Sequence, residues 1–232
     1  MKLLLFLFSL FMDWILYSVF KMRIKTIIFC VILEITAFIA FSNAAFYSFF
    51  LCFFIIGIIK LLRNVLFGCS DVSTYKISNF LYSAGIPIFI SIIEPIALSF
   101  EKLSTYQHSI ELLLLCCIAS IIADTSASEI SQMTKSKTYS ILTFKKVKPG
   151  YDGGISFFGT FGSLITTLIF LLVSSCYITY NNNEFLLVYL FSILSCMLDS
   201  VLGASLQKKK IISNEQTNFI AIAFTFTLLF FI

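Results

Sequence analysis

Two carboxylates at the end of one apolar segment have the surroundings of metal ligands. Asp124 and Glu129 lie in the stretch ADTSASEI. On a helix, Asp124 shares a face with Ser128, and Thr125 shares the neighbouring face with Glu129. Magnesium prefers oxygen ligands and often binds through carboxylates, retained waters and substrate phosphates. This helix end is therefore predicted to bind magnesium through Asp124 and Glu129, with helix packing as the alternative.

A third carboxylate, Asp199, lies deep in a later apolar segment, LDSVLGASLQ. Together with Ser200, Gly203 and Gln207 it forms a polar stripe, and the small residues around it permit close approach of another helix. A carboxylate inside a membrane is costly and usually faces a partner or a water-filled cavity. Asp199 is therefore expected either to serve a site or to mediate helix association. The same choice applies to Glu94, which immediately precedes Pro95.

The segment between these carboxylates supplies positive charge. Lys145, Lys146 and Lys148 precede a glycine pair, Gly153 and Gly154, which leads into an apolar run. A helix that begins after a glycine-rich turn presents free backbone N–H groups and a positive dipole end to an anion. Phosphate is the expected guest, although no GxxxxGK[ST] loop occurs. The alternative is a flexible connection between two membrane segments.

The composition places these residues in a membrane protein. Hydrophobic residues make up 59% of the 232 residues, charged residues 12%, and the mean hydropathy is +0.99. Such a chain cannot keep its apolar surface out of water as a soluble globule. A spanning helix needs about 20 mainly apolar residues. We therefore predict an all-α, multi-pass bundle of about eight transmembrane helices, within a range of six to eight, at 3–20, 24–42, 44–62, 79–100, 109–127, 157–180, 185–206 and 216–232.

The basic residues predict the orientation of this bundle. If the N-terminus is non-cytoplasmic, the loops after spans one, three, five and seven hold 14 of the 16 lysines and arginines. This asymmetry follows the positive-inside rule. The loop 130–156, with five lysines, is then cytoplasmic. The chain is expected to form one membrane domain over 1–232, in which helices of 106–232 carry the polar motifs.

Other classes of function find little support in the residues. The seven cysteines are scattered, without metal-ligand spacing, and read as small buried hydrophobes. His108 lies far along the chain from the carboxylates and is not expected to be a catalytic base. The net charge of +4 is explained by the cytoplasmic loops facing anionic lipid, so no nucleic-acid partner is predicted.

Four motifs in the second half resemble those of a known family. The stretches ADTSASEI, TFKKVKPGYDGGISFFGTFGSL, LDSVLGASLQ and TNFIA look like the ordered motifs of an integral-membrane family that includes the plant phytyl-phosphate kinase. The resemblance covers about 119–232, and the first part, 1–105, matches only in hydropathy. Three positions depart from the family pattern. They are Ser126, Ser131 and Asp152, where the family usually has an aromatic residue, glycine and asparagine.

The resemblance implies transfer of a phosphoryl group from a nucleoside triphosphate, with CTP as the co-substrate, to a prenyl phosphate or prenol in the bilayer. It places Asp199 at the same magnesium site as Asp124 and Glu129, so that all three are expected to be catalytic. The residues implied to bind nucleotide or phosphate are Lys145, Lys146, Lys148, Gly153, Gly154, Ser156, Gly159, Thr160, Gln207 and Asn218. The chemistry agrees, because phosphoryl transfer depends mainly on positioning, a divalent metal and cations.

Two other functions remain open on the sequence. A membrane cytidylyltransferase would use the same groups but form a CDP-linked lipid. A transporter or noncatalytic membrane subunit would need none of this chemistry. Transporters usually contain repeated halves with a site at the midplane, whereas no internal repeat is evident here and the polar residues gather at one interface. The oligomeric state is left open.

Overall fold

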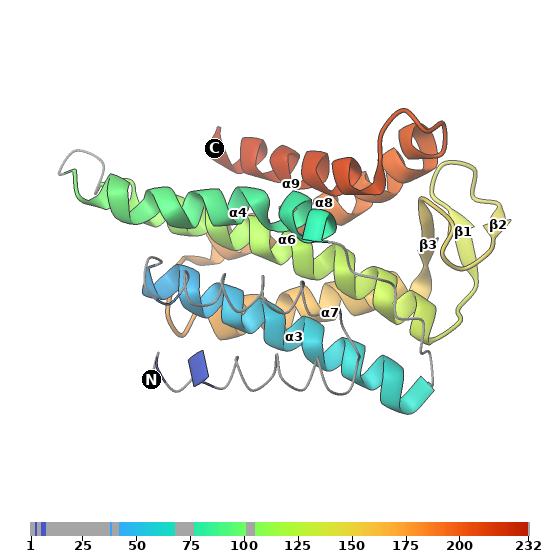
Figure 1. The fold of residues 1–232 in the computed structure, drawn as a ribbon, viewed down its shortest axis with the longest axis horizontal. Helices are drawn as coiled ribbons and strands as arrows, with labels where there is room; N and C mark the ends of the chain where they lie inside the picture. The colour runs from blue at the N-terminus through green and yellow to red at the C-terminus, as the bar shows by residue number, and fades with distance from the viewer. Residues whose placement is uncertain are drawn as a thin grey trace.

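The computed structural model describes residues 42–67, 77–100 and 105–231, together with Leu3, Phe6, Leu7 and Phe38. Within them, six α-helices lie roughly along one direction, and a small sheet caps one end of the bundle (Figure 1). The helices are α3 (Asn43–Phe67), α4 (Ile77–Leu98), α6 (Gln107–Met133), α7 (Phe157–Ser174), α8 (Asn182–Leu202) and α9 (Asn214–Phe230).

Helix α6 is the centre of the bundle. It contacts α3, α4, α7, α8 and α9. Two thirds of its apolar span is buried inside the protein, compared with 22 to 39% for the other three spans of membrane-crossing length. Its run from Leu112 to Ala119 is buried on every side. A helix that is apolar all round belongs at the centre of a large core or a membrane bundle, and α6 occupies that place.

Four described segments are long and apolar enough to cross a membrane: Asn43–Arg63, Gln107–Met133, Phe157–Ser174 and Asn182–Gln207. Helix α4 holds a shorter apolar stretch, Tyr82–Ile96, with Pro87 and Pro95 inside the helix. The helical membrane fold is thus confirmed, whereas the count of eight spans and the side of the N-terminus stay predictions. The predicted spans 3–20 and 24–42 lie almost entirely outside the described residues.

The ends of the last three helices are fixed by local side chains. Ser156 caps α7 by accepting a hydrogen bond from the Gly159 N–H. Capping boxes begin the other two helices, through Asn181 with Glu184 at α8 and through Ser213 with Gln216 at α9. Each cap satisfies backbone N–H groups that have no partner within the helix. These caps set the depth at which the polar residues of each helix lie.

The predicted loop 130–156 is partly regular structure. Helix α6 continues to Met133, and three strands follow: β1 (Thr138–Ser140), β2 (Lys146–Val147) and β3 (Gly154–Ser156). They form an antiparallel sheet in the order β2-β1-β3, with Thr138 opposite Val147 on one side and Ser156 on the other. Strands of two or three residues are too short to show an alternating pattern, so no sheet was predicted within this loop.

A second departure from the expected regular helices occurs after α8. Residues Gly203–Gln207 form a π-helical turn, η1, at the end of the predicted span 185–206. Such turns widen the helix locally and are often found at functional sites. Asp199 lies one turn before it, on the side of the bundle that faces α9 and α6.

Candidate functional site

A small polar cavity brings Asp124 and Asp199 together from two helices. Asp124 comes from α6 and Asp199 from α8, and the two carboxylates are close enough to repel each other when both are charged. Four helices line the cavity. Its residues are Ser83, Ser120, Ile121, Asp124, Thr125, Ser195, Asp199, Asn218, Ala221 and Ile222. The association of Asp124 with Asp199, expected from the family resemblance, is therefore present.

The cavity lies below the sheet-bearing end of the bundle. Asp124 is nine residues before the end of α6 at Met133, which corresponds to about 13 Å along a helix. Asp199 is eight residues before Gln207, the end of η1. Ser195 and Asp199 both line the cavity because they are four residues apart and lie on the same face of α8. The two carboxylates thus reach the cavity at similar depths.

Asp199 has a carboxylate oxygen without a partner. Its Oδ1 is buried and accepts no hydrogen bond from any described residue, while the Thr217 hydroxyl of α9 lies beside the carboxylate. An unsatisfied buried acceptor costs free energy and calls for an explanation. A cation or a bound water in the cavity would supply the missing partner.

The remaining polar atoms of the cavity are mostly oxygens. The amide of Asn218 donates through Nδ2 to the Ser83 hydroxyl over 3.3 Å, which leaves the amide oxygen of Asn218 as an acceptor. Ser120 donates to the Cys116 carbonyl and also lies 3.4 Å from the Thr225 hydroxyl. Carboxylate, amide and hydroxyl oxygens around an unsatisfied carboxylate fit the ligand preference of magnesium.

The size of the cavity limits what it can hold. Its volume is about 20 Å³, enough for a water molecule or a small ion. A nucleotide or a prenyl chain is far larger. The cavity is therefore a candidate ion site, and larger ligands would have to approach it from the end of the bundle or from the lipid.

Glu129, the third predicted ligand, is directed elsewhere. Its Oε2 lies 2.6 Å from Arg63 Nη1 of α3, and both side chains are about nine-tenths buried. Five residues along a helix correspond to a rotation of about 140° away from Asp124. The described residues contain no group of three His, Cys, Asp or Glu side chains that could hold a metal ion. In this structure Glu129 thus lies apart from Asp124 and Asp199, and a metal site at these carboxylates stays a prediction.

The glycines of the predicted phosphate loop are used for close packing. Gly153 adopts φ +72°, and a Cβ there would lie 2.4 Å from the Ala204 backbone nitrogen and from the Ser200 carbonyl oxygen. Gly159 packs in the same way against the Ala127 carbonyl of α6. The turn before β3 thus rests on the π-helical turn. A role of these glycines in binding phosphate stays a prediction.

The helix after the glycine pair begins where the predicted span 157–180 begins. Helix α7 begins at Phe157, after strand β3, and its N-terminal turn is capped by Ser156, which also donates to the Ser131 hydroxyl over 2.8 Å. Ser131, which stands where the resembled family usually has glycine, therefore joins α6 to the start of α7. Thr160 accepts a hydrogen bond from Ser163 through its carbonyl oxygen.

The lysines lie above the cavity rather than in it. Lys145, Lys146 and Lys148 are exposed, and none forms an ion pair with a described residue. Lys208, after the π-helical turn, lies 5.3 Å from the centre of the Tyr151 ring. Of the predicted nucleotide-binding residues, only Asn218 lines the cavity, and Gln207 lies outside it in η1.

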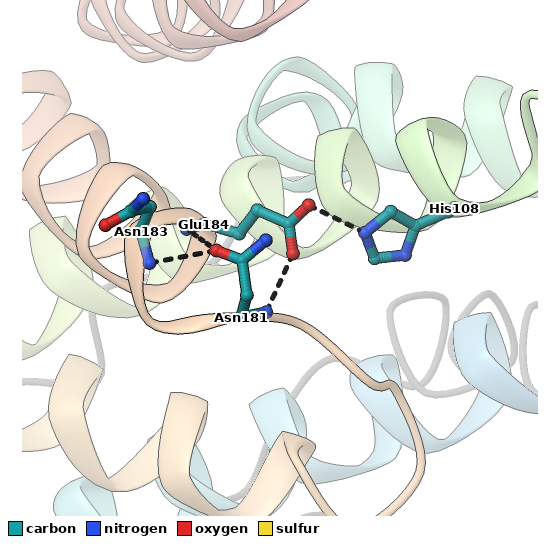
Figure 2. Close-up of polar contacts among 4 residues, drawn as sticks. All are labelled: His108, Asn181, Asn183 and Glu184. Atoms are coloured by element: carbon teal, nitrogen blue, oxygen red, sulfur yellow. Dashed lines mark hydrogen bonds and ion pairs between the residues drawn. The ribbon is translucent and has the colours of Figure 1, made fainter.

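His108 lies at the opposite end of α6 and stabilises a helix start. His108 Nε2 lies 2.9 Å from Glu184 Oε1, while Glu184 Oε2 accepts from the Asn181 N–H of the capping box; both contacts are drawn in Figure 2. His108 is 16 residues before Asp124, or about 24 Å along the helix. Its position agrees with the prediction that it is not a base at the carboxylate site.

Ser83 and Ser120 are among the cavity residues that were not predicted from the sequence. The position of Ser83 could have been noticed because it stands four residues before Pro87 in α4. Proline has no N–H, so the Ser83 carbonyl lacks its usual hydrogen bond within the helix. Ser120 could also have been noticed, because it lies four residues before Asp124 on the same face of α6. Neither signal identifies a partner helix, so the pairing needed the tertiary structure.

Comparison with known proteins places the chain in a family. A family model described as integral membrane protein DUF92 matches residues 7–226. An uncharacterized membrane protein of Methanocaldococcus jannaschii is 32% identical over 105 residues, which cover 45% of this chain and 43% of that relative. The match thus spans less than half of the relative's length. No solved structure matches the chain. The chain accordingly belongs to the DUF92 family of integral membrane proteins.

Proposed function

We propose that this protein is a membrane phosphotransferase that moves a phosphoryl group from a nucleoside triphosphate, with CTP as the favoured donor, to a prenyl phosphate or prenol. The observation that carries the proposal is the paired Asp124 and Asp199 in a polar cavity, with a carboxylate oxygen left unsatisfied. Paired carboxylates below a lysine-bearing surface are the groups that phosphoryl transfer requires.

Asp124 and Asp199 would hold a magnesium ion, with the amide oxygen of Asn218 as a further ligand. Bound there, magnesium would supply positive charge to offset the charge on the transferring phosphoryl group. The protein groups would bind and orient the donor. Lys146 and Lys148 are exposed and free of ion pairs with described residues, so they are available to phosphate oxygens.

The acceptor lipid fits the surroundings of the site. Its isoprenoid tail would lie in the bilayer against the apolar helix surfaces, and its polar head would reach the end of the bundle. The motif resemblance to the phytyl-phosphate kinase family supports both the prenyl acceptor and CTP. The positive-inside distribution supports a cytoplasmic site, where nucleotide is available.

A second candidate function is that of an ion or solute transporter. It is supported by Glu94 of α4, which lies outside the cavity of Asp124 and Asp199. Glu94 is fully buried, its Oε2 accepts from the Ser42 hydroxyl over 2.8 Å, and its Oε1 has no partner among the described residues. Intramembrane carboxylates near prolines often mark ion pathways. A flux of ions through vesicles that depends on Glu94 and not on CTP would favour this function.

The deciding experiment is an assay of the purified protein in nanodiscs. It is incubated with CTP, magnesium and a panel of prenols and prenyl phosphates, and products are identified by mass spectrometry. A new prenyl phosphate or diphosphate together with CDP supports the kinase, whereas a CDP-linked lipid indicates a cytidylyltransferase. Asp124→Asn should remove the product. Glu111→Gln is the matched control, because Glu111 lies on the same helix and pairs with Gln107 at the far end.

A further inference from the structure

Two bulky apolar side chains are exposed at the tip of the hairpin formed by β1 and β2. The exposed fraction is 48% for Leu142 and 76% for Phe144. Neither lies on a membrane-spanning helix, so lipid around the bundle does not by itself cover them. Exposed apolar groups rimmed by polar residues mark surfaces that bind another protein or a membrane.

The backbone holds Phe144 in this exposed position. Phe144 adopts φ +54°, which is uncommon for a bulky residue. Its N–H donates to the Ser140 carbonyl over 2.8 Å, and the Ser140 N–H donates to the Lys145 carbonyl over 2.9 Å. The turn is therefore closed at both sides. A strained turn that displays an aromatic ring indicates a use for that ring outside the sheet.

Exposed lysines lie next to the tip and along the sheet and its approaches. Lys145 follows Phe144 directly, and Lys135, Lys137, Lys146 and Lys148 are also exposed on the same sheet and its approaches. None of the five forms an ion pair with a described residue. A combination of aromatic rings and unpaired lysines complements the anionic headgroup layer of a bilayer, which attracts basic residues and accepts apolar ones at the acyl boundary.

The hairpin also lies close to the bilayer because the chain joins it directly to two candidate membrane spans. The chain leaves the candidate span α6 at Met133 and enters the candidate span α7 at Phe157. The first turns of α7 expose Phe157 and Phe161, whose rings stack with centroids 6.1 Å apart. Aromatic residues of this kind gather at the membrane interface. The hairpin is thus tied at both ends to the level of the headgroups.

We propose that the tip of the β1–β2 hairpin docks on the anionic headgroup layer of the membrane that holds the helices. Leu142 and Phe144 enter the acyl boundary, and Lys145 contacts lipid phosphate. Lys145, which was predicted to bind nucleotide, would then bind lipid instead. Lys146 and Lys148 would remain to bind the nucleotide donor. The inference does not depend on the proposed phosphotransferase activity.

The test uses tryptophan fluorescence in vesicles. The chain has a single tryptophan, Trp14, so Phe144→Trp is made in a Trp14→Phe background. The protein is reconstituted in phosphatidylcholine with or without phosphatidylglycerol, using lipids brominated near the headgroup as quenchers. We expect blue-shifted emission and quenching about twofold stronger in the anionic vesicles. High salt or Lys145→Gln should reduce the difference, because salt screens exposed charges.

Two further variants keep the test decisive. Leu142→Trp reports on the same tip if the first variant folds poorly, and Phe161→Trp, on a candidate span, should be quenched in both lipids. Emission of a water-exposed tryptophan at 144 and 142, without quenching, would overturn the proposal. Blue-shifted emission that bromolipids leave unquenched would also overturn it, since the tip would then be covered by protein, such as a second copy of the chain.

Discussion

Arg63 Nη1 of α3 lies 2.6 Å from Glu129 Oε2 of α6, and this buried ion pair joins the two helices. It also separates Glu129 from Asp124, although both residues belong to one short motif. Arg63 has a second, longer contact of 3.4 Å with Gln132 Oε1. Glu129 is therefore expected to position α6 against α3 rather than to bind a metal.

Breaking this pair should lower stability more than it changes the site. Glu129→Ala removes the carboxylate that pairs with the buried Arg63, and loss of one member of a buried ion pair typically costs roughly 3 to 5 kcal/mol. Unfolding in mixed detergent micelles measures the loss. The double variant Arg63→Met with Glu129→Leu should recover much of the stability. A stable Glu129→Ala protein with lost metal binding would instead restore Glu129 to the ligand set.

Asp124→Asn should weaken metal binding directly, because it removes a charged oxygen ligand from the cavity. Binding can be measured without turnover by the electron paramagnetic resonance signal of manganese as it is titrated into the protein. We expect a loss of at least about tenfold in affinity, in keeping with loss of a ligand charge. Unchanged manganese affinity would assign Asp124 to helix packing.

Asp199→Ala should lower phosphoryl transfer by at least about a hundredfold, within the range for removal of a positioned electrostatic group. Stability should change much less, because one oxygen of Asp199 already lacks a partner among the described residues. Both quantities are measured on one preparation. If Asp199→Ala unfolds the protein or keeps full turnover, the residue serves helix association.

Two glycines with positive φ offer a matched comparison of strain and packing. Gly150 has φ +80°, and a Cβ added there would have no other atom within 4 Å. Gly153 has φ +72°, and a Cβ added there would collide with Ala204 and Ser200. Gly150→Ala should cost about 1 to 2 kcal/mol from the backbone alone. Gly153→Ala should cost a further 1 to 3 kcal/mol, roughly, from overpacking. Chemical denaturation measures both, and equal losses would contradict the docking of the turn on η1.

The sheet-bearing end should face the cytoplasm. Lys137 is exposed just before β1, so a Lys137→Cys variant offers an accessible thiol there. In intact cells an impermeant maleimide should leave it unlabelled, and labelling should appear once the membrane is opened. Labelling from outside intact cells would reverse the orientation expected from the 14 basic residues on one side.

The sequence by itself determined the class of this protein and the identity of its principal polar residues. The apolar composition and segment lengths predicted a helical membrane bundle, because backbone polar groups in lipid must be satisfied within each segment. The cost of a carboxylate at membrane depth pointed to Asp199 and Glu94, whereas Asp124 was predicted together with Glu129 from the stretch ADTSASEI. Both inferences depend on the composition and length of single segments, which can be read directly from the sequence.

Only the tertiary structure decided which polar residues meet. Glu129 turned toward Arg63, 66 residues away in the chain, and Ser83 met Asn218 across 135 residues. Helix periodicity gives the face on which a residue lies but not the helix that covers that face. The packing of Gly153 against the π-helical turn at Gly203–Gln207 likewise has no local signal in the sequence. Such pairings arise from how the helices pack, and that packing is not encoded in any one local pattern.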